Sequence, residues 1–143
     1  GLVYVTGKDG VIAFTVNPVG DTLEIGLGNG HADNIAEGPF REGMTPIFTV
    51  SAYEPVTGEL VWQHTASTDS AIGASGNLVT SGDLVFQGTD VGEFFTLDAR
   101  TGERLFEYQH TRPIRASPLT YEGNGKQYVS VVSTNDVITF ALP

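Results

Sequence analysis

The sequence contains no cysteine and few basic residues. The absence of cysteine excludes disulfide frameworks, thiolate nucleophiles and zinc–sulfur sites, and it leaves the redox compartment open. Lys and Arg together number 7 against 17 Asp and Glu, which gives a formal net charge of −10 at pH 7. Because nucleic-acid affinity rests largely on basic side chains that neutralise phosphates, this balance excludes a nucleic-acid-binding role.

Long apolar segments are also missing. No run approaches the roughly 18 apolar residues of a membrane-spanning helix, so we expect no membrane span. The chain has 143 residues and starts at Gly1, with neither an initiator Met nor a signal peptide. These features predict a mature or excised segment, either one domain or a piece of a larger one.

Helical periodicity is absent as well, since no window sustains a 3.6-residue apolar period beyond two turns. Val (15) and Thr (16) are abundant, as on half-buried pleated surfaces. We therefore predict an antiparallel all-β chain with less than about 10% helix, against a usual share near one-third. Three turn signals are expected to close hairpins: Lys8-Asp9-Gly10 between 2–5 and 11–16, residues 89–92 between 84–86 and 93–97, and residues 123–125 between 119–121 and 127–132.

An internal repeat is the strongest signal in the sequence. Residues 52–62 align without gaps on residues 96–106, at an offset of 44 residues (96 − 52). The shared pattern is small-apolar-acid-x-x-Thr-Gly-Glu-x-apolar-aromatic. A period of about 40–50 residues that holds short strands indicates the blade of a β-propeller. Two chance hairpins of similar composition are the alternative, which the coincidence of turn, acid and aromatic in one register disfavours.

Each residue type in the repeat has a physical task. The Thr-Gly pair is expected to turn between the two outer strands, with Gly at positive φ. The acid four residues earlier can accept hydrogen bonds from the amides of the turn. The terminal aromatic, Trp62 or Phe106, is predicted to occupy equivalent outer-strand positions and to wedge between neighbouring blades.

These residues resemble a known family. The two repeats are similar to the tryptophan-docking motif Ala-x-Asp-x-x-x-Gly-x-x-x-Trp of quinoprotein alcohol dehydrogenases, which are eight-bladed propellers that bind pyrroloquinoline quinone (PQQ). Residues 82–89 and residues 114–121 with 125–129 resemble the segments on either side of that family's penultimate docking motif. The resemblance implies a fold that is an arc of four-stranded antiparallel blades from an eight-bladed propeller. It covers most of residues 47–143 and is weaker over residues 1–46.

The repeat period also predicts how the single partial propeller domain, residues 1–143, is divided. We expect a first blade over residues 1–65 with an insertion at 17–46, a full blade over 71–110, and an incomplete last blade over 114–143. By the resemblance, the missing outermost strand would come from the remainder of the propeller chain. An arc alone would leave open blade faces and a bare strand edge, both of which favour aggregation.

The resemblance implies PQQ and calcium or another metal as cofactors of the parent protein. It places the metal ligands, the catalytic Asp and a vicinal Cys pair in earlier blades, so no catalytic or metal-binding residue is expected in this chain. The cofactor-binding candidates are Ser75 and Gly76, which align where many members carry a Gly-Gly pair after a Trp or Asn. Ala74 replaces that large side chain, and a plain turn into the inner strand is the alternative.

Other candidate residues are weaker. Acidic residues of the insertion could offer oxygen ligands to a hard cation, but their spacing matches no ligand loop and favours a solvated loop. His64 and His110 are interpreted as equivalent, structural positions of the repeat. Arg115 could meet an anionic group in the central channel, although surface or interblade pairing is favoured. The cation candidates are Glu24, His31, Asp33, Glu37 and Glu42.

The leading functional hypothesis is the C-terminal propeller segment of a periplasmic PQQ-dependent dehydrogenase that oxidises alcohols or sugars. In it this segment forms one structural wall of the cofactor chamber, and electrons pass to an acceptor such as a cytochrome or quinone. The isolated segment is expected to be inactive. The alternative is a non-catalytic propeller of similar repeats that acts as a protein-binding scaffold, because a fold does not determine a function.

Overall fold

The computed structural model describes residues 1–9, 15–19, 22–26, 47–66 and 75–141. These residues form strands and turns, and none of them is helical or could cross a membrane as a helix. The strands are β1 (Val3–Asp9), β2 (Thr15–Val19), β3 (Thr22–Gly26), β4 (Ile47–Tyr53), β5 (Leu60–Ala66), β6 (Asn77–Val79), β7 (Leu84–Gly88), β8 (Glu93–Asp98), β9 (Arg104–Gln109), β10 (Leu119–Gly123), β11 (Lys126–Ser133) and β12 (Asp136–Ala141).

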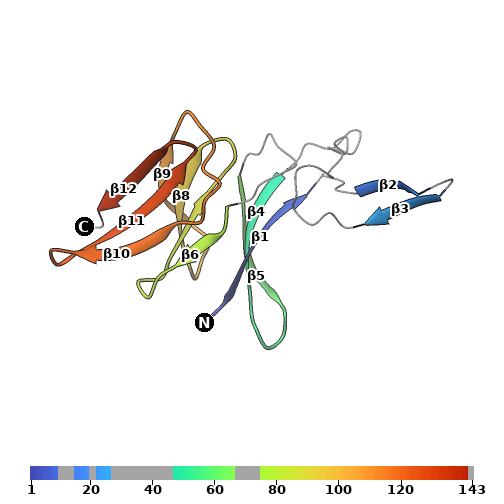
Figure 1. The fold of residues 1–143 in the computed structure, drawn as a ribbon. Coiled ribbons are helices and arrows are strands. Elements are labelled where there is room, and N and C mark those ends of the chain that lie inside the picture. The colour runs from blue at the N-terminus through green and yellow to red at the C-terminus, as the bar shows by residue number, and fades with distance from the viewer. Residues whose placement is uncertain (10–14, 20–21, 27–46, 67–74, 142–143) are drawn as a thin grey trace.

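The strands form antiparallel sheets that follow one another along the chain (Figure 1). The first sheet has the order β1-β4-β5, the second β6-β7-β8-β9 and the third β10-β11-β12, while β2 and β3 make a separate hairpin. Every pairing among the described strands is antiparallel. This architecture confirms the all-β prediction, and successive antiparallel sheets of three or four strands are what the blades of a propeller require.

Two hydrophobic clusters join the sheets face to face, and they define a first and a second junction. The second sheet contributes to both, because successive side chains of a strand point to opposite faces. Strand β8 is accordingly buried at its four central positions. The first junction holds Phe48, Val50, Ala52 and Trp62 against Val85, Phe95, Leu97 and Ala99. The second holds Phe86 and Phe94 with Ile114, Val129 and Val131.

The repeat has the same backbone in both copies. Gly58 and Gly102 have φ of +71° and +73° between the two outer strands, as the Thr-Gly pattern predicts. The Asp98 carboxylate accepts hydrogen bonds from the amides of Arg100 and Thr101, at 2.8 and 3.0 Å. These bonds lower the pKa of Asp98, because they favour its charged form. Sequence identity in the repeat therefore reflects a shared, capped turn.

Two of the three predicted hairpins are confirmed. Strands β7 and β8 pair around residues 89–92, and β10 and β11 pair around Asn124-Gly125. Asn124 and Gly125 have φ of +53° and +73°, which is the backbone that a two-residue turn of this kind requires.

The hairpin expected around Lys8-Asp9-Gly10 is wrong. Strand β1 continues through Lys8 and Asp9, which pair with Phe48 and Ile47 of β4 and so do not turn, and residues 10–14 lie outside the described part of the chain. Pairing with β4 prevailed over the local turn signal, because the apolar side chains of β4 are buried against the second sheet. The β2-β3 hairpin lies in sequence between β1 and β4.

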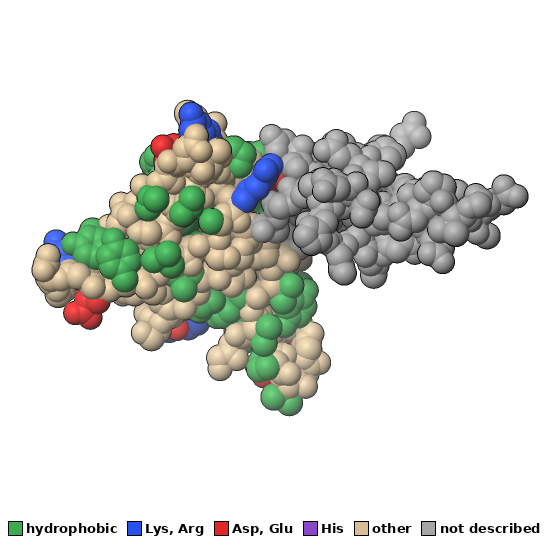
Figure 2. Space-filling view, viewed as in Figure 1, with side chains coloured by type: hydrophobic (Ala, Val, Ile, Leu, Met, Phe, Trp, Pro, Cys, Tyr) green, Lys and Arg blue, Asp and Glu red, His purple; other side chains and the backbone are tan. Residues whose placement is uncertain are grey.

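Apolar side chains remain exposed at two tips of the molecule. Figure 2 shows hydrophobic atoms over the projecting β4-β5 hairpin and over the end where β10 and β11 meet. Val56 is 89% exposed at the first tip. At the second tip, Tyr121 and Tyr128 stack with 5.3 Å between ring centroids. Both tips are surfaces on which further protein could pack.

Candidate functional site

The Ser75-Gly76 segment leads into β6 and is held by the loop that follows β9. Ser75 is buried, and its hydroxyl lies 3.0 Å from the carbonyl oxygen of Ala116 and 2.8 Å from that of Gly76. Its own carbonyl oxygen accepts a hydrogen bond from Gln87 at 3.0 Å. The hydroxyl and the carbonyl oxygen of Ser75 are thus both hydrogen-bonded within the protein. Its buried side chain has no free surface for a ligand.

Gly76 differs from Ser75 because it is exposed. A Cβ at this position would lie 2.4 Å from the Ser117 Oγ, so a larger residue would force that hydroxyl aside. One side of Gly76 is therefore packed on Ser117 while its backbone stays accessible. Of the two candidates, Gly76 offers exposed backbone, whereas Ser75 is buried behind it.

A hollow of about 270 Å³ lies beside the same loop. It is lined by Pro113, Arg115, Ala116, Val132 and Thr134. Arg115 is exposed there, and it forms no ion pair with another described residue. An exposed guanidinium in an open hollow can attract an anion, but it does not make a closed binding site.

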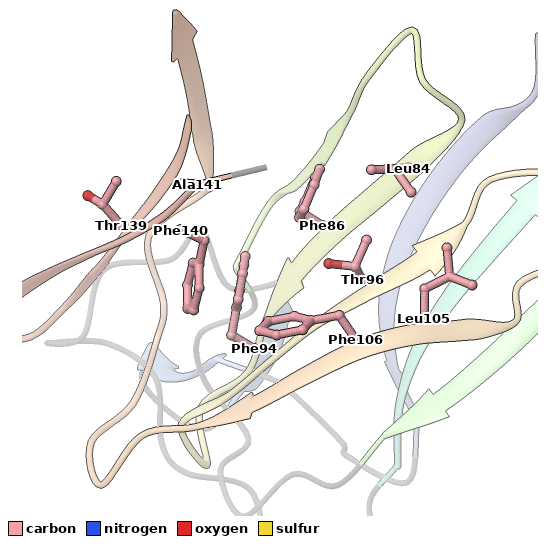
Figure 3. Close-up of a pocket in the computed structure, with 9 residues that line it drawn as sticks. All are labelled: Leu84, Phe86, Phe94, Thr96, Leu105, Phe106, Thr139, Phe140 and Ala141. Carbon is pink, nitrogen blue, oxygen red and sulfur yellow. The ribbon is translucent and has the colours of Figure 1, made fainter. Parts of the chain in front are cut away.

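A hollow of about 560 Å³ is an apolar groove at the second junction (Figure 3). Phe94 stacks on Phe140 with 5.2 Å between ring centroids, and Phe106 meets Phe140 edge-on at 5.5 Å. The groove is lined by Leu84, Phe86, Phe94, Thr96, Leu105, Phe106, Thr139, Phe140 and Ala141. It contains no ionisable side chain, so it is a packing surface rather than a site for acid–base chemistry.

His64 lies at the first junction, where a guanidinium donates to it. Arg104 Nη2 is 3.0 Å from His64 Nε2, so this nitrogen is the acceptor and the imidazole is neutral. The His64 ring also lies 5.2 Å from the Phe95 ring. Burial, and then the charge of Arg104, lower the pKa of His64 below its ordinary value of 6.5, although the Glu93 carboxylate opposes this. Arg104 itself pairs with Glu93 and Glu107.

His110 is at the second junction. The backbone amide of Arg112 donates to His110 Nδ1 at 3.2 Å, the Ser133 hydroxyl lies 2.9 Å from the same nitrogen, and Asp136 is 3.5 Å from Nε2. Although Ser, His and a carboxylate meet here, Ser133 is fully buried, so no substrate can reach its hydroxyl. The cluster joins the end of β9 to the turn between β11 and β12.

The equivalence of His64 and His110 is wrong. His64 pairs with Val50 on β4, two residues before Ala52, and the corresponding residue on β9 is Tyr108, which pairs with Phe94. The Gln-His-Thr match is displaced by two residues from the repeat register. Each histidine nevertheless contacts the next sheet along the chain.

The metal-binding candidates of the insertion lie outside the residues whose side chains the structure describes. Within the described residues, no group of three or more His, Asp or Glu side chains is placed to hold a metal ion. The acidic candidates of the insertion, together with His31, have no described side chains. Of the described residues, those around Ser75 and Gly76 therefore remain the candidate site.

Sequence reasoning missed Gln87, which supports this site. Gln87 is fully buried and donates from Nε2 to the carbonyl oxygens of Ser75 and Gly88, at 3.0 and 2.8 Å. The available signal was a single amide inside the apolar run Leu-Val-Phe-Gln-Gly. A buried amide must find hydrogen-bond partners, so its presence in such a strand indicates a fixed polar connection.

Comparison with known proteins finds one matching family model and several similar alcohol dehydrogenases. A family model described as the outer membrane protein assembly factor BamB matches residues 48–141. The quinoprotein alcohol dehydrogenase PedE of Pseudomonas putida is 41% identical over 83 residues, 58% of this chain and 13% of that protein. The 1-butanol dehydrogenase (cytochrome c) of Thauera butanivorans is 38% identical over 95 residues, 65% of this chain and 13% of that protein.

A solved structure extends the likeness. The quinohemoprotein alcohol dehydrogenase ADHIIG from Pseudomonas putida HK5 matches 96% of this chain and 21% of its own, with a TM-score of 0.67 and 26% identity. The chain thus spans about one-eighth of the length of the two curated relatives described above. Its similarity is to one part of much longer dehydrogenases.

Proposed function

Because this chain belongs to the quinoprotein alcohol dehydrogenase family, as a segment of its propeller, we propose that it is the C-terminal propeller segment of a PQQ-dependent dehydrogenase. The whole protein would oxidise alcohols or sugars. The identity of about 40% to named alcohol dehydrogenases, over 83 and 95 residues of this chain, carries this proposal. Activity, substrate and partners belong to a protein several times longer than this chain.

In this proposal the segment forms one wall of the cofactor chamber. PQQ, when bound, supplies the electron acceptor for alcohol oxidation. The exposed backbone of Gly76 would lie against the cofactor, and Ser75 would hold that backbone from behind. No residue of this chain is assigned a catalytic role, since the resemblance places the metal ligands and the base elsewhere in the protein.

The order of the sheets along the chain supports the propeller division that the repeat period predicts. We assign one blade to residues 1–65 with an insertion at 17–46, one to 71–110, and an incomplete last blade to 114–143. The second sheet has four strands and the third has three, with β12 at its edge among the described residues. A strand from the remainder of the propeller chain would pair with β12 and cover the apolar groove.

Electron transfer and location complete the proposal. The acceptor would be a cytochrome or a quinone, and the name of one relative, 1-butanol dehydrogenase (cytochrome c), supports the former. The resemblance implies a periplasmic protein. Fractionation of cells that express the full-length protein checks this, and recovery with the cytoplasmic marker would contradict it.

A scaffold function is the second candidate. The family model that matches residues 48–141 is described as an outer membrane protein assembly factor, so repeats of this kind occur outside dehydrogenases. A scaffold would keep the turns and the buried aromatic without a cofactor. It would bind neither PQQ nor an alcohol.

Dye-linked alcohol oxidation with added PQQ and Ca²⁺ separates the two functions. We expect turnover by the full-length protein and none by the 143-residue chain, because the metal and base lie outside it. Turnover by the chain alone would refute the assignment of the site. A full-length protein that neither binds PQQ nor oxidises alcohols would establish the scaffold instead.

A further inference from the structure

Gln87 has a buried side chain whose amide nitrogen and oxygen are both hydrogen-bonded. It lies on β7, opposite Asn77 of β6, and none of its surface is exposed. Its two N–H groups donate to the carbonyl oxygens of Ser75 and Gly88, at 3.0 and 2.8 Å. Its Oε1 accepts from the Thr6 hydroxyl at 3.0 Å. Both N–H groups and the carbonyl oxygen of the Gln87 amide are therefore hydrogen-bonded, each to a different segment.

The same network reaches the first sheet. The Thr6 hydroxyl, on β1, accepts from Asn77 Nδ2 at 3.2 Å, and Asn77 Nδ2 also lies 3.4 Å from the carbonyl oxygen of Tyr4. Among the described residues, no buried side-chain nitrogen or oxygen lacks a hydrogen-bond partner. A fully satisfied buried network rigidifies the segments that it joins, since breaking one bond leaves other polar groups without partners.

We propose that Gln87 is a positioning residue of the cofactor-facing wall. It fixes the backbone of Ser75 and, through Ser75, the exposed backbone of Gly76. This inference rests on the proposed function, because it takes Gly76 as the surface that a planar quinone meets. Ser117 limits Gly76 on one side and Ala116 holds the Ser75 hydroxyl, while Gln87 supplies the hydrogen bond from the sheet itself. A ligand contact made by bare backbone has no side chain to adjust, so its geometry depends on these supports.

Gln87→Met tests the role with little change in shape. Methionine keeps the length and the buried contacts but removes both donors, which leaves the carbonyl oxygens of Ser75 and Gly88 without this partner. Thr139→Val is the matched control, because it removes a partly buried hydroxyl pair with Ser130, 2.7 Å apart, in the third sheet. Both variants are made in the full-length protein.

Two measurements are compared for wild type, Gln87→Met and Thr139→Val. The first is hydrogen exchange of a peptide that covers residues 75–77, without cofactor. The second is the dissociation constant for PQQ in the presence of Ca²⁺. We expect Gln87→Met to speed exchange and to raise the dissociation constant by about tenfold, the scale of one lost buried hydrogen bond. Thr139→Val should change neither.

The outcomes distinguish the inference from the proposed function. Unchanged exchange in Gln87→Met overturns the positioning role. Faster exchange with an unaltered dissociation constant, in a protein that binds PQQ, overturns only the link between this turn and the cofactor. Should the wild type fail to bind PQQ, the proposed function falls together with that link. A Gln87→Met protein that does not fold is replaced by Thr6→Val, which removes the donor to Gln87 Oε1 and should show a smaller change of the same sign.

Discussion

The two junctions present the same repeat position to different neighbours. At the first junction Trp62 is 9% exposed and donates its indole N–H to the carbonyl oxygen of Ala99, at 3.0 Å. Tyr4 donates to that same oxygen, also at 3.0 Å. At the second junction Phe106 is 44% exposed and lines an open groove.

The difference comes from the neighbouring sheet and not from the repeat. The turn between β8 and β9 covers Trp62, and a Cβ on Gly102 would lie 2.7 Å from the indole ring. The third sheet has no fourth strand among the described residues, so no corresponding turn covers Phe106. Burial of the aromatic is thus completed by the next blade, and each blade stabilises the one before it.

Trp62→Ala should have the largest effect on this comparison. Removing a buried aromatic loses its transfer free energy and leaves a cavity, so we expect about 3–5 kcal/mol less unfolding free energy in the full-length propeller. Denaturant midpoints of wild type and variant measure it. Trp62→Phe, which keeps a ring but loses the N–H donor, serves as the control and should cost less. A loss below about 1 kcal/mol for Trp62→Ala would show that the indole does not lock the junction.

Gly102→Ala should have the second largest effect, and Gly58→Ala is its matched control. Both glycines have φ near +70°, so alanine costs each about 1–2 kcal/mol of backbone strain. At Gly58 nothing lies within 4 Å of the new Cβ, whereas at Gly102 it meets the indole. Overpacking adds about 1–3 kcal/mol. Thermal or denaturant unfolding of the two variants checks the difference, and equal losses would mean that Trp62 does not rest on Gly102.

Much of the fold could be predicted from the sequence, because local signals and packing agree there. The Thr-Gly turns, the capping acid and the Asn124-Gly125 hairpin all depend on residues that are close in the chain. The pairing of β1 with β4 could not be predicted locally, since it brings together strands separated by residues 10–46. Loop length costs little free energy, so apolar burial decided that pairing.

The candidate site was harder to predict than the fold. Alignment to the family pointed to Ser75 and Gly76, but only the packing separates the two, one buried and the other exposed. Gln87 acts on Ser75 from 12 residues away through a single hydrogen bond. The register error at His110 has the same origin, because letters that match can fall two positions from the true pair.

Phe106→Ala tests whether the second junction is completed by further chain. In the 143-residue chain we expect a loss of about 1–2 kcal/mol, because the ring is only partly buried. In the full-length protein, where we propose that another strand pairs with β12, the loss should rise toward that of Trp62→Ala. Unfolding free energies of both forms give the comparison. Equal, small losses would contradict a covering strand.

The smallest expected effect is a pH dependence of stability at the first junction. His64 is half-buried, accepts from Arg104, and is faced by the carboxylates of Glu93 and Glu107 through that guanidinium. Its pKa in the folded protein is lower than the ordinary 6.5 that applies when the chain unfolds. The unfolded state therefore binds more protons between these two values.

The stability that neutral His64 contributes is fully present above pH 6.5 and is lost as the pH falls through the lower, folded pKa. Protonation would place a cation beside Arg104 and remove the acceptor that the guanidinium uses. His64→Gln keeps an acceptor but cannot titrate. Below pH 6.5 the unfolding free energy of the wild type should therefore fall relative to that of His64→Gln. Taking the difference cancels the contributions of all groups that the two proteins share. Parallel stability profiles from pH 7.5 to about 5 would show that the first junction does not sense protons through His64.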